Sequence, residues 1–162
     1  MIRFVGAALL AIALMMPAAS SAQAGEPGEF PWKAGDAPPT VAGVTLGISR
    51  AALDSALGPP ARVQTLGSGA DAPRALSYPA LGLSIVFSDL DGVAVIYLLT
   101  AEAGAIDEIK VGEDRGRVIG RWGPPSTQEG QSALYIAGKW VVVVRYDGGG
   151  HVAQLGLGRM GN

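Results

Sequence analysis

The sequence contains no cysteine and only one histidine among its 162 residues. Without cysteine the chain can form no disulfide bond, and it cannot carry a lipid on a cysteine at the end of an export signal. The single His151 excludes a metal site built from several histidines, and any serine–histidine–aspartate triad would have to use it. Stability must therefore come from packing, which favours one fused core over two independent cores of about 60 residues.

Positive charge is also scarce. If Arg3 is removed with an export signal, 11 of the 12 lysines and arginines remain against 14 aspartates and glutamates, and they form no basic block. Nucleic acids and anionic membrane surfaces are bound by clustered lysine and arginine. The composition therefore argues against both as partners, and we expect no stable membrane anchor once the signal is cleaved.

Residues 1–24 have the pattern of a cleaved signal peptide. Arg3 precedes an apolar run from Phe4 to Met16, and small residues then lead to Ala22-Gln23-Ala24. The run is shorter than the ~20 residues that a membrane-spanning helix needs, whereas Ala-x-Ala is a typical cleavage pattern. We predict cleavage before Gly25, with cleavage after Ala22 as the alternative, and a periplasmic or secreted location.

Residues 25–40 are rich in proline and glycine, a composition that buries little apolar surface. We therefore predict a flexible arm in front of the folded body. Phe30 and Trp32 are its only large apolar residues. They either pack loosely on the chain's own body or anchor a short contact with a partner.

The rest of the chain contains a repeated pattern. The stretch from Leu46 to Pro60 matches the stretch from Val111 to Pro125 at an offset of 65 positions. The matched positions are Gly47 with Gly112, Arg50 with Arg115, and Gly58-Pro59-Pro60 with Gly123-Pro124-Pro125. We therefore predict two similar units, residues 41–100 and 101–162, that together form one compact body.

Each unit is predicted to begin with a capped helix and to continue as an antiparallel meander. Ser49 and Asp114 are good N-caps, while Gly58 and Gly123 suit the position after a helix end. We expect a helix at 50–57 and strands at 62–66, 75–78, 83–87, 93–99, 140–146 and 152–157. The predicted fold class is α+β: two tandem helix-plus-antiparallel-meander repeats with the helices packed on one face of the sheet.

This pattern resembles the SmpA/OmlA type of small envelope domain, and two such units in one exported chain are similar in plan to the β-lactamase inhibitor protein fold. The resemblance rests on Gly47, Ser49, Leu53, Leu57-Gly58-Pro59 and Tyr78, and on Gly112, Asp114, Val118, Trp122-Gly123-Pro124 and Tyr135. It implies a non-enzymatic protein-binding module of the cell envelope. The inhibitor proteins carry disulfides, and the envelope members are usually lipoproteins. This chain has no cysteine, so it can form no disulfide and carry no lipid on a cysteine. No functional residue is therefore carried over.

Motifs for catalysis or cofactor binding are weak. His151 directly follows three glycines, which indicates a solvated residue in a turn. Gly156 to Gly161 matches a dinucleotide pattern by letter, but no helix is expected after it to hold the pyrophosphate. Asp89-Leu90-Asp91-Gly92 lacks the later ligands of a calcium loop and suits a hairpin turn. We therefore expect no catalytic, cofactor-binding or metal-binding residues.

Comparison of the two units suggests a partner-binding surface. In the first unit Leu83, Ile85 and Phe87 alternate with a half-polar face made of Ser84, Val86 and Ser88. The three positions aligned with that face in the second unit hold Trp140, Val142 and Val144, and Tyr146 is next in the same phase. If the alignment holds, these four form an exposed stripe, and tryptophan and tyrosine are frequent interface anchors. A one-residue slip of the alignment, or burial of both faces, would make them core instead.

The sequence leads to three functional hypotheses. The first is an exported, non-enzymatic protein-binding module, an inhibitor, assembly or accessory factor whose partner is another envelope or secreted protein. Arg115, Arg117 and Arg121 are either a solvated helix face or a site for an acidic partner. The second is a periplasmic small-ligand-binding protein with an apolar pocket lined by Trp122 or Tyr135. The third is a hydrolase, which would require an acid–base pair near His151.

Overall fold

The structure is a computed structural model, and it describes residues 30–33, 35–37 and 39–160. The predicted signal peptide lies outside the described residues. In chain order the elements are β1 (Thr40–Val41), β2 (Val44–Thr45), α1 (Arg50–Leu57), β3 (Arg62–Thr65), β4 (Arg74–Tyr78), β5 (Leu83–Ser88), β6 (Gly92–Leu98), α2 (Arg115–Trp122), β7 (Thr127–Glu129), β8 (Ser132–Ala137), β9 (Trp140–Tyr146) and β10 (Val152–Arg159). Two short 3₁₀ turns are Pro79–Leu81 and Ala101–Ala103.

Each helix spans eight residues because the sequence caps it at both ends. The side chain of Ser49 accepts a hydrogen bond from the backbone amide three residues on, at 3.3 Å, and Asp114 does the same at 3.0 Å. Gly58 and Gly123 end the helices with a φ of 75°, which side chains rarely tolerate. The predicted helix at 50–57 and both predicted N-caps are confirmed.

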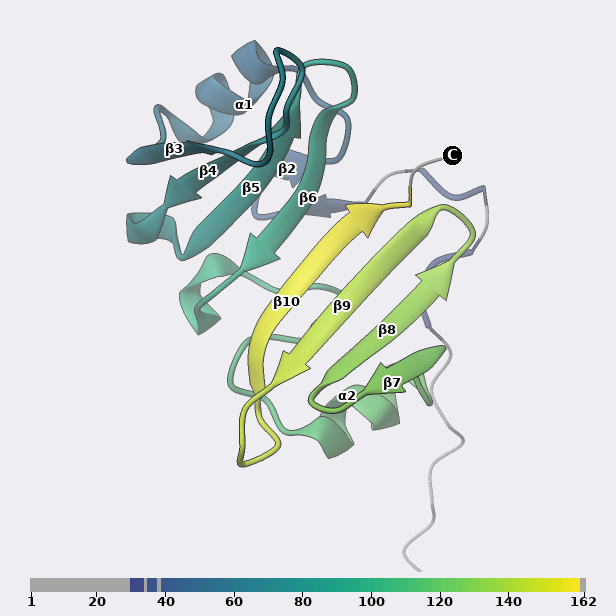
Figure 1. Cartoon of the computed structure of the whole chain (residues 1–162). Coiled ribbons are helices and arrows are strands. Elements are labelled where there is room, and N and C mark those ends of the chain that lie inside the picture. The colour runs from purple at the N-terminus through teal and green to yellow at the C-terminus, as the bar shows by residue number, and fades with distance from the viewer. Residues whose placement is uncertain (1–29, 34, 38, 161–162) are drawn as a thin grey trace, which may run out of the picture.

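Strands β3 to β10 form one antiparallel sheet in the order β3-β4-β5-β6-β10-β9-β8-β7. It consists of two four-stranded meanders that join where β6 pairs with β10, a junction called the seam below (Figure 1). At the seam Leu98 lies opposite Leu155, and Tyr97 lies opposite Gly156. The predicted strand at 140–146 is confirmed, and the other predicted strands agree to within two residues at each end.

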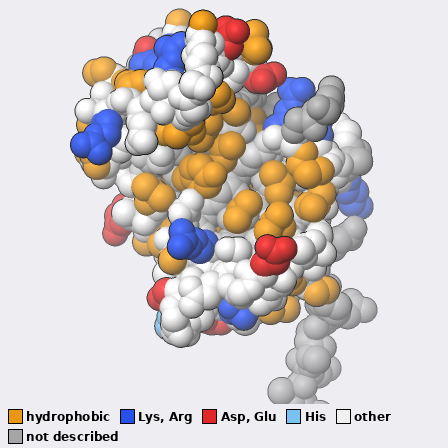
Figure 2. All heavy atoms as spheres, in the orientation of Figure 1, with side chains coloured by type: hydrophobic (Ala, Val, Ile, Leu, Met, Phe, Trp, Pro, Cys, Tyr) orange, Lys and Arg blue, Asp and Glu red, His pale blue; other side chains and the backbone are white. Residues whose placement is uncertain are grey.

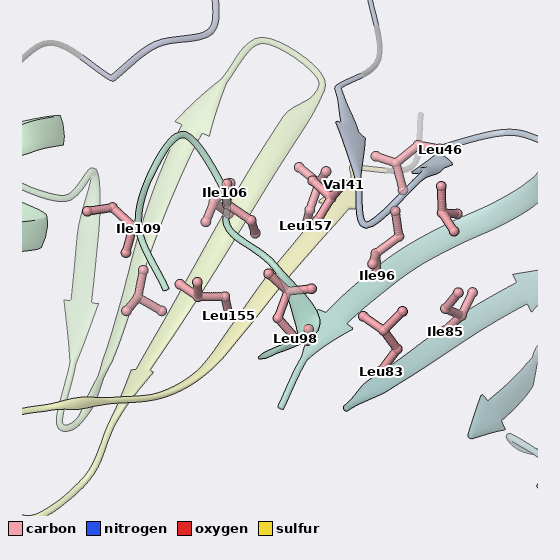
Figure 3. Close-up of a cluster of buried hydrophobic side chains, with 14 of the residues drawn as sticks. Val41, Leu46, Leu83, Ile85, Ile96, Leu98, Ile106, Ile109, Leu155 and Leu157 are labelled. Carbon is pink, nitrogen blue, oxygen red and sulfur yellow. The ribbon is translucent and has the colours of Figure 1, made fainter. Parts of the chain in front are cut away.

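One face of the sheet, called the core face, is buried from β4 to β8, whereas the edge strands β3 and β7 are exposed. Its side chains form a single hydrophobic cluster that continues across the seam, from β5 and β6 to β10 (Figure 3). Val41 and Leu46, in and just after the β1–β2 hairpin, cover part of this cluster together with Ile106 and Ile109. The latter two exchange backbone hydrogen bonds of 2.9 and 3.0 Å, which close a tight turn over the sheet.

The predicted fold class, α+β with two tandem helix-plus-meander repeats, is wrong. The molecule is mostly one eight-stranded antiparallel sheet with two short helices. The physical reason is that early caps limit each helix to eight residues, so each contributes little to the layer over the core face. Leu53 is the one fully buried side chain of α1, and Val118 and Trp122 are those of α2. Hairpin β1–β2 and the turn at 106–109 supply much of the remaining cover.

Two glycines, Gly120 in α2 and Gly92 at the start of β6, provide a test of stability. At Gly120 in α2 a Cβ would meet no atom within 4 Å, so Gly120→Ala should raise the free energy of unfolding by about 0.5–1 kcal/mol. At Gly92 a Cβ would lie 2.4 Å from the carbonyl oxygen of Ile48, so Gly92→Ala should lower it by about 2 kcal/mol or more. Urea unfolding measures both changes. A Gly92→Ala variant as stable as the natural chain would contradict this geometry.

Candidate functional site

The sheet face opposite the core face, called the open face, has no helix over it among residues 39–160. Two rows of side chains cross it, each following the registered pairs from strand to strand. One row is Arg62, Ser77, Ser84, Tyr97, Gly156, Val143, Leu134 and Thr127, and the other is Gln64, Ala75, Val86, Val95, Gly158, Val141 and Ile136. Figure 2 shows the resulting concentration of apolar side chains over the middle of this face.

At the centre of the open face the ring of Tyr97, on β6, lies over Gly156, on β10. A Cβ added at Gly156 would lie 2.8 and 2.9 Å from two ring carbons of Tyr97, so only glycine leaves room for the ring in this position. Glycine in a strand interior often marks a close approach of this kind. The aromatic ring is therefore held against the sheet rather than projecting into solvent.

Gly158 has a related role one row away. A Cβ there would lie 3.4 Å from Val95 and 3.6 Å from Val141, which approach from the two neighbouring strands. Side chains from β6 in the first meander and β9 in the second consequently lie over the central strand β10. Tyr97, Val95, Val141 and Val143 are half-buried although nothing is packed above them in the described part of the chain.

Charged side chains lie at the margins of the open face. Arg62 is on edge strand β3, Glu129 on edge strand β7, and Arg145 near the end of β9. The hydroxyls of Ser77, Ser84 and Tyr97 form no hydrogen bond with any described residue. The site thus offers an apolar centre, a short row of free hydroxyls and a charged rim, which is the composition of many protein interfaces.

The predicted partner-binding stripe does not lie on this face. Trp140, Val142, Val144 and Tyr146 are at most 2% exposed and belong to the hydrophobic core, so the exposed-stripe interpretation is wrong. The one-residue slip considered as its alternative is what occurs: Val141 and Val143 are the β9 residues that face outward with Ser84. Alternation in a strand has a period of two, so a slip of one residue exchanges the faces.

A polar concavity of about 520 Å³ lies at the start of α2, between Asp114, Arg115, Gln131 and residues 147–150. Asp147 accepts backbone hydrogen bonds from His151 and Gly149 at 2.9 Å each, and the bond from His151 is the main reason that the pKa of Asp147 lies below its ordinary value. His151 is exposed, and its Nδ1 lies 3.6 Å from this carboxylate. These are the hydrogen bonds of a structured turn, and none of them joins His151 to a serine or threonine hydroxyl that could act as a nucleophile.

The arginines of α2 have partners within the chain. Arg121 contacts Asp107 at 3.0 Å, Arg117 contacts Glu113 at 3.6 Å, and Arg115 lies over the ring of Tyr146 at 4.4 Å. These contacts favour a solvated, internally paired helix face over a site for an acidic partner. Among the residues that the structure describes, no three acidic or histidine side chains are grouped to hold a metal ion.

Sequence reasoning missed the residues at the centre of the open face. The available signal was the alternation Leu155-Gly156-Leu157-Gly158, in which leucine marks the core face and glycine leaves the other face without side chains. From the sequence, Gly156 is predicted to lie in a strand and a dinucleotide motif at Gly156 to Gly161 is rejected, but these glycines are assigned no role on a sheet face. The importance of Tyr97 follows from its place opposite Gly156, a pairing between strands about 60 residues apart along the chain.

Among the solved structures that resemble this fold are those of two bacterial proteins. A cysteine-rich secretory protein from Staphylococcus aureus subsp. aureus Mu50 matches with a TM-score of 0.58 at 16% identity, covering 83% of this chain and 50% of that one. An extracellular protein containing a SCP domain from Bacillus anthracis str. Ames matches with a TM-score of 0.57 at 13% identity, covering 76% of this chain and 47% of that one. The chain thus spans about half the length of each, and the likeness concerns the fold alone.

No protein-family model matches the chain, and no curated protein matches its sequence. The two structural likenesses do not bear on the resemblance to SmpA/OmlA domains and the β-lactamase inhibitor fold, which stays a prediction. In the described part of the chain, no helix has the length and apolar character needed to cross a membrane.

The two faces of the sheet should respond differently to truncation. Trp140→Ala removes a buried core side chain and should cost about 3–5 kcal/mol of unfolding free energy. Ile136→Ala removes an open-face side chain that is 39% exposed and should cost about 1 kcal/mol or less. Thermal and urea unfolding distinguish the two. Equal losses would mean that the face assignment of β8 and β9 is incorrect.

Proposed function

We propose that this chain is an exported, non-enzymatic binding module and that its open face binds another exported protein. The observation that carries the proposal is the Tyr97 ring held over Gly156 in the middle of a broad apolar face. Tyrosine is a frequent interface hot spot, and a side chain already fixed in place loses little conformational entropy on binding. Its free hydroxyl adds a directional contact for the partner.

A protein is the occupant that this surface suits best. The open face is broad and unenclosed, so a small molecule lying on it would keep much of its surface in water, whereas small-ligand sites enclose most of the ligand. A protein can cover the apolar centre and meet the charges of Arg62, Arg145 and Glu129 at the rim. The small-ligand alternative required an apolar pocket at Trp122 or Tyr135, but Phe30 packs against both rings.

Export is supported by the sequence of residues 1–24 and by the fold, which resembles one secretory and one extracellular protein. Expression of the full chain in a bacterial host, followed by fractionation and N-terminal sequencing, tests this part. We expect a periplasmic or secreted chain that begins at Gly25. An uncleaved chain retained in the cytoplasm or membrane would contradict it.

The binding surface is tested by site-specific photocrosslinking in the exported fraction. A crosslinker at Val143, on the open face, should capture one protein species, and the same crosslinker at Ile119, which is 37% exposed on α2, should not. With that partner purified, Tyr97→Ala should weaken binding at least tenfold. Gly156→Ala should also weaken it, because the new Cβ displaces the ring without removing any open-face side chain.

Two outcomes would overturn the assignment of this surface. Equal crosslinking at Val143 and Ile119 would mean that the open face is not selective, and capture of a second copy of this chain would replace the separate partner by self-association. Each variant is checked by its melting temperature, so that a loss of binding is not mistaken for a loss of fold. Ile119→Ala is the matched control for affinity.

A further inference from the structure

Residues 30–33 and 35–37, called the arm below, lie against the second meander on the core-face side of the sheet. The Phe30 ring stacks on Tyr135 with centroids 5.4 Å apart and meets Trp122 edge-on at 5.6 Å. Trp32 packs against Phe30 at 5.4 Å. Farther along the arm, the indole N–H of Trp140 donates to the carbonyl oxygen of Asp36 at 3.2 Å.

Trp122, Tyr135 and Trp140 form the wall under the arm and are called the aromatic slot. Two of these side chains are fixed by groups outside the arm. Trp122 Nε1 donates to Asp107 Oδ2 at 2.9 Å, and the Tyr135 hydroxyl donates to the carbonyl of Gly123 at 3.2 Å. Burial raises the pKa of Tyr135 to about 12, so this hydroxyl keeps its proton at neutral pH. Trp122 and Tyr135 therefore keep these partners if the arm leaves.

The arm itself is held mainly by side chains. Among the described residues, no backbone-to-backbone hydrogen bond joins residues 30–32 or 35–37 to a helix or to the sheet. Phe30 and Trp32 are only half-buried, and the arm becomes part of a hairpin only at Thr40. Segments with few buried contacts and no shared ladder open at a small fraction of the global unfolding free energy.

The slot exists in one half of the molecule only. At the matching position of the first half, Leu57 replaces Trp122, and the described arm makes its ring contacts in the second half alone. The two halves are otherwise alike in their helix caps. Trp122, with Phe30 packed against it, is thus a feature of the second half.

We propose that the aromatic slot is a second binding site, one for an extended peptide segment that carries an aromatic side chain, and that the arm is its resident, exchangeable occupant. The slot provides an aromatic pocket for the ring and the Trp140 indole N–H for a backbone carbonyl of the segment. A competing segment must displace the arm first, so the arm sets the threshold for binding. The site lies on the opposite side of the sheet from the open face and does not depend on the function proposed for that face.

The test uses the arm's own sequence as the probe. A fluorescent peptide of residues 28–37 is titrated into the full mature chain carrying Phe30→Ala and Trp32→Ala, and into the natural chain. Because a tethered segment acts at an effective concentration of about millimolar, the peptide should bind the double variant at least tenfold more tightly than the natural chain. The same peptide with Phe30→Ala should bind neither.

A slot variant identifies where the peptide binds. Trp122→Leu, which installs the residue that the first half has at position 57, should weaken peptide binding to the double variant at least tenfold. Equal binding to the natural chain and the double variant, or no effect of Trp122→Leu in a folded protein, would overturn the proposal. So would a folded double variant that does not bind the peptide.

A measurement on the natural chain keeps the proposal testable if the double variant unfolds. In isotope-labelled protein the indole N–H resonances of Trp32 and Trp140 report on the arm and the slot separately. Unlabelled peptide at several millimolar should shift the Trp32 resonance, because the arm is displaced, and should leave that of Trp140 near its place, because the peptide supplies the same carbonyl. The Phe30→Ala peptide should shift neither, and a Trp32 resonance that stays unchanged with the natural peptide would overturn the proposal.

Discussion

The pairing of β6 with β10 is the interaction on which the rest of the structure depends. Without it, both strands would be unpaired sheet edges, and each meander would be a small sheet with little apolar surface to bury. With it, Leu98 and Leu155 meet and one core continues across the junction. A chain with no cysteine has no disulfide to join its halves, so this seam and the cluster beneath it hold them together.

The same junction determines the character of both faces. On the core face it is lined by leucine and isoleucine, and loops as much as helices cover it. On the open face Gly156 and Gly158 remove the side chains of β10, which lets Tyr97 and Val95 lie across the junction. The two proposed binding sites therefore have different origins: the open face comes from the seam, and the aromatic slot from bulky residues in one half that the arm covers.

Local features could be predicted from the sequence because their causes are local. Helix caps at Ser49 and Asp114, helix ends at Gly58 and Gly123, and the strand from Trp140 to Tyr146 depend on near neighbours. The face of Trp140 was assigned wrongly because a shorter loop in the second half changes the alignment by one residue. Side chains alternate between the two faces of a strand, so an error of one residue exchanges the faces. The fold class failed for two reasons: each eight-residue helix adds little to the layer over the core face, and the seam joins strands far apart along the chain, a pairing that no local pattern encodes. Packing of Phe30 on the chain's own body was one of the two alternatives, but its partner Tyr135, about 100 residues along the chain, could not be named for the second of these reasons.

Native-state hydrogen exchange at the seam tests most directly the claim that the two meanders form one rigid sheet. The backbone amides that pair Leu98 with Leu155 and Ile96 with Leu157 should exchange only through global unfolding. Their exchange free energies should then equal those of the central strands β5 and β9 and should fall with urea at the same slope. Seam amides that exchange at a lower free energy than the strands on either side would mean that the halves separate before they unfold. That result would contradict a single sheet as the support of the open face.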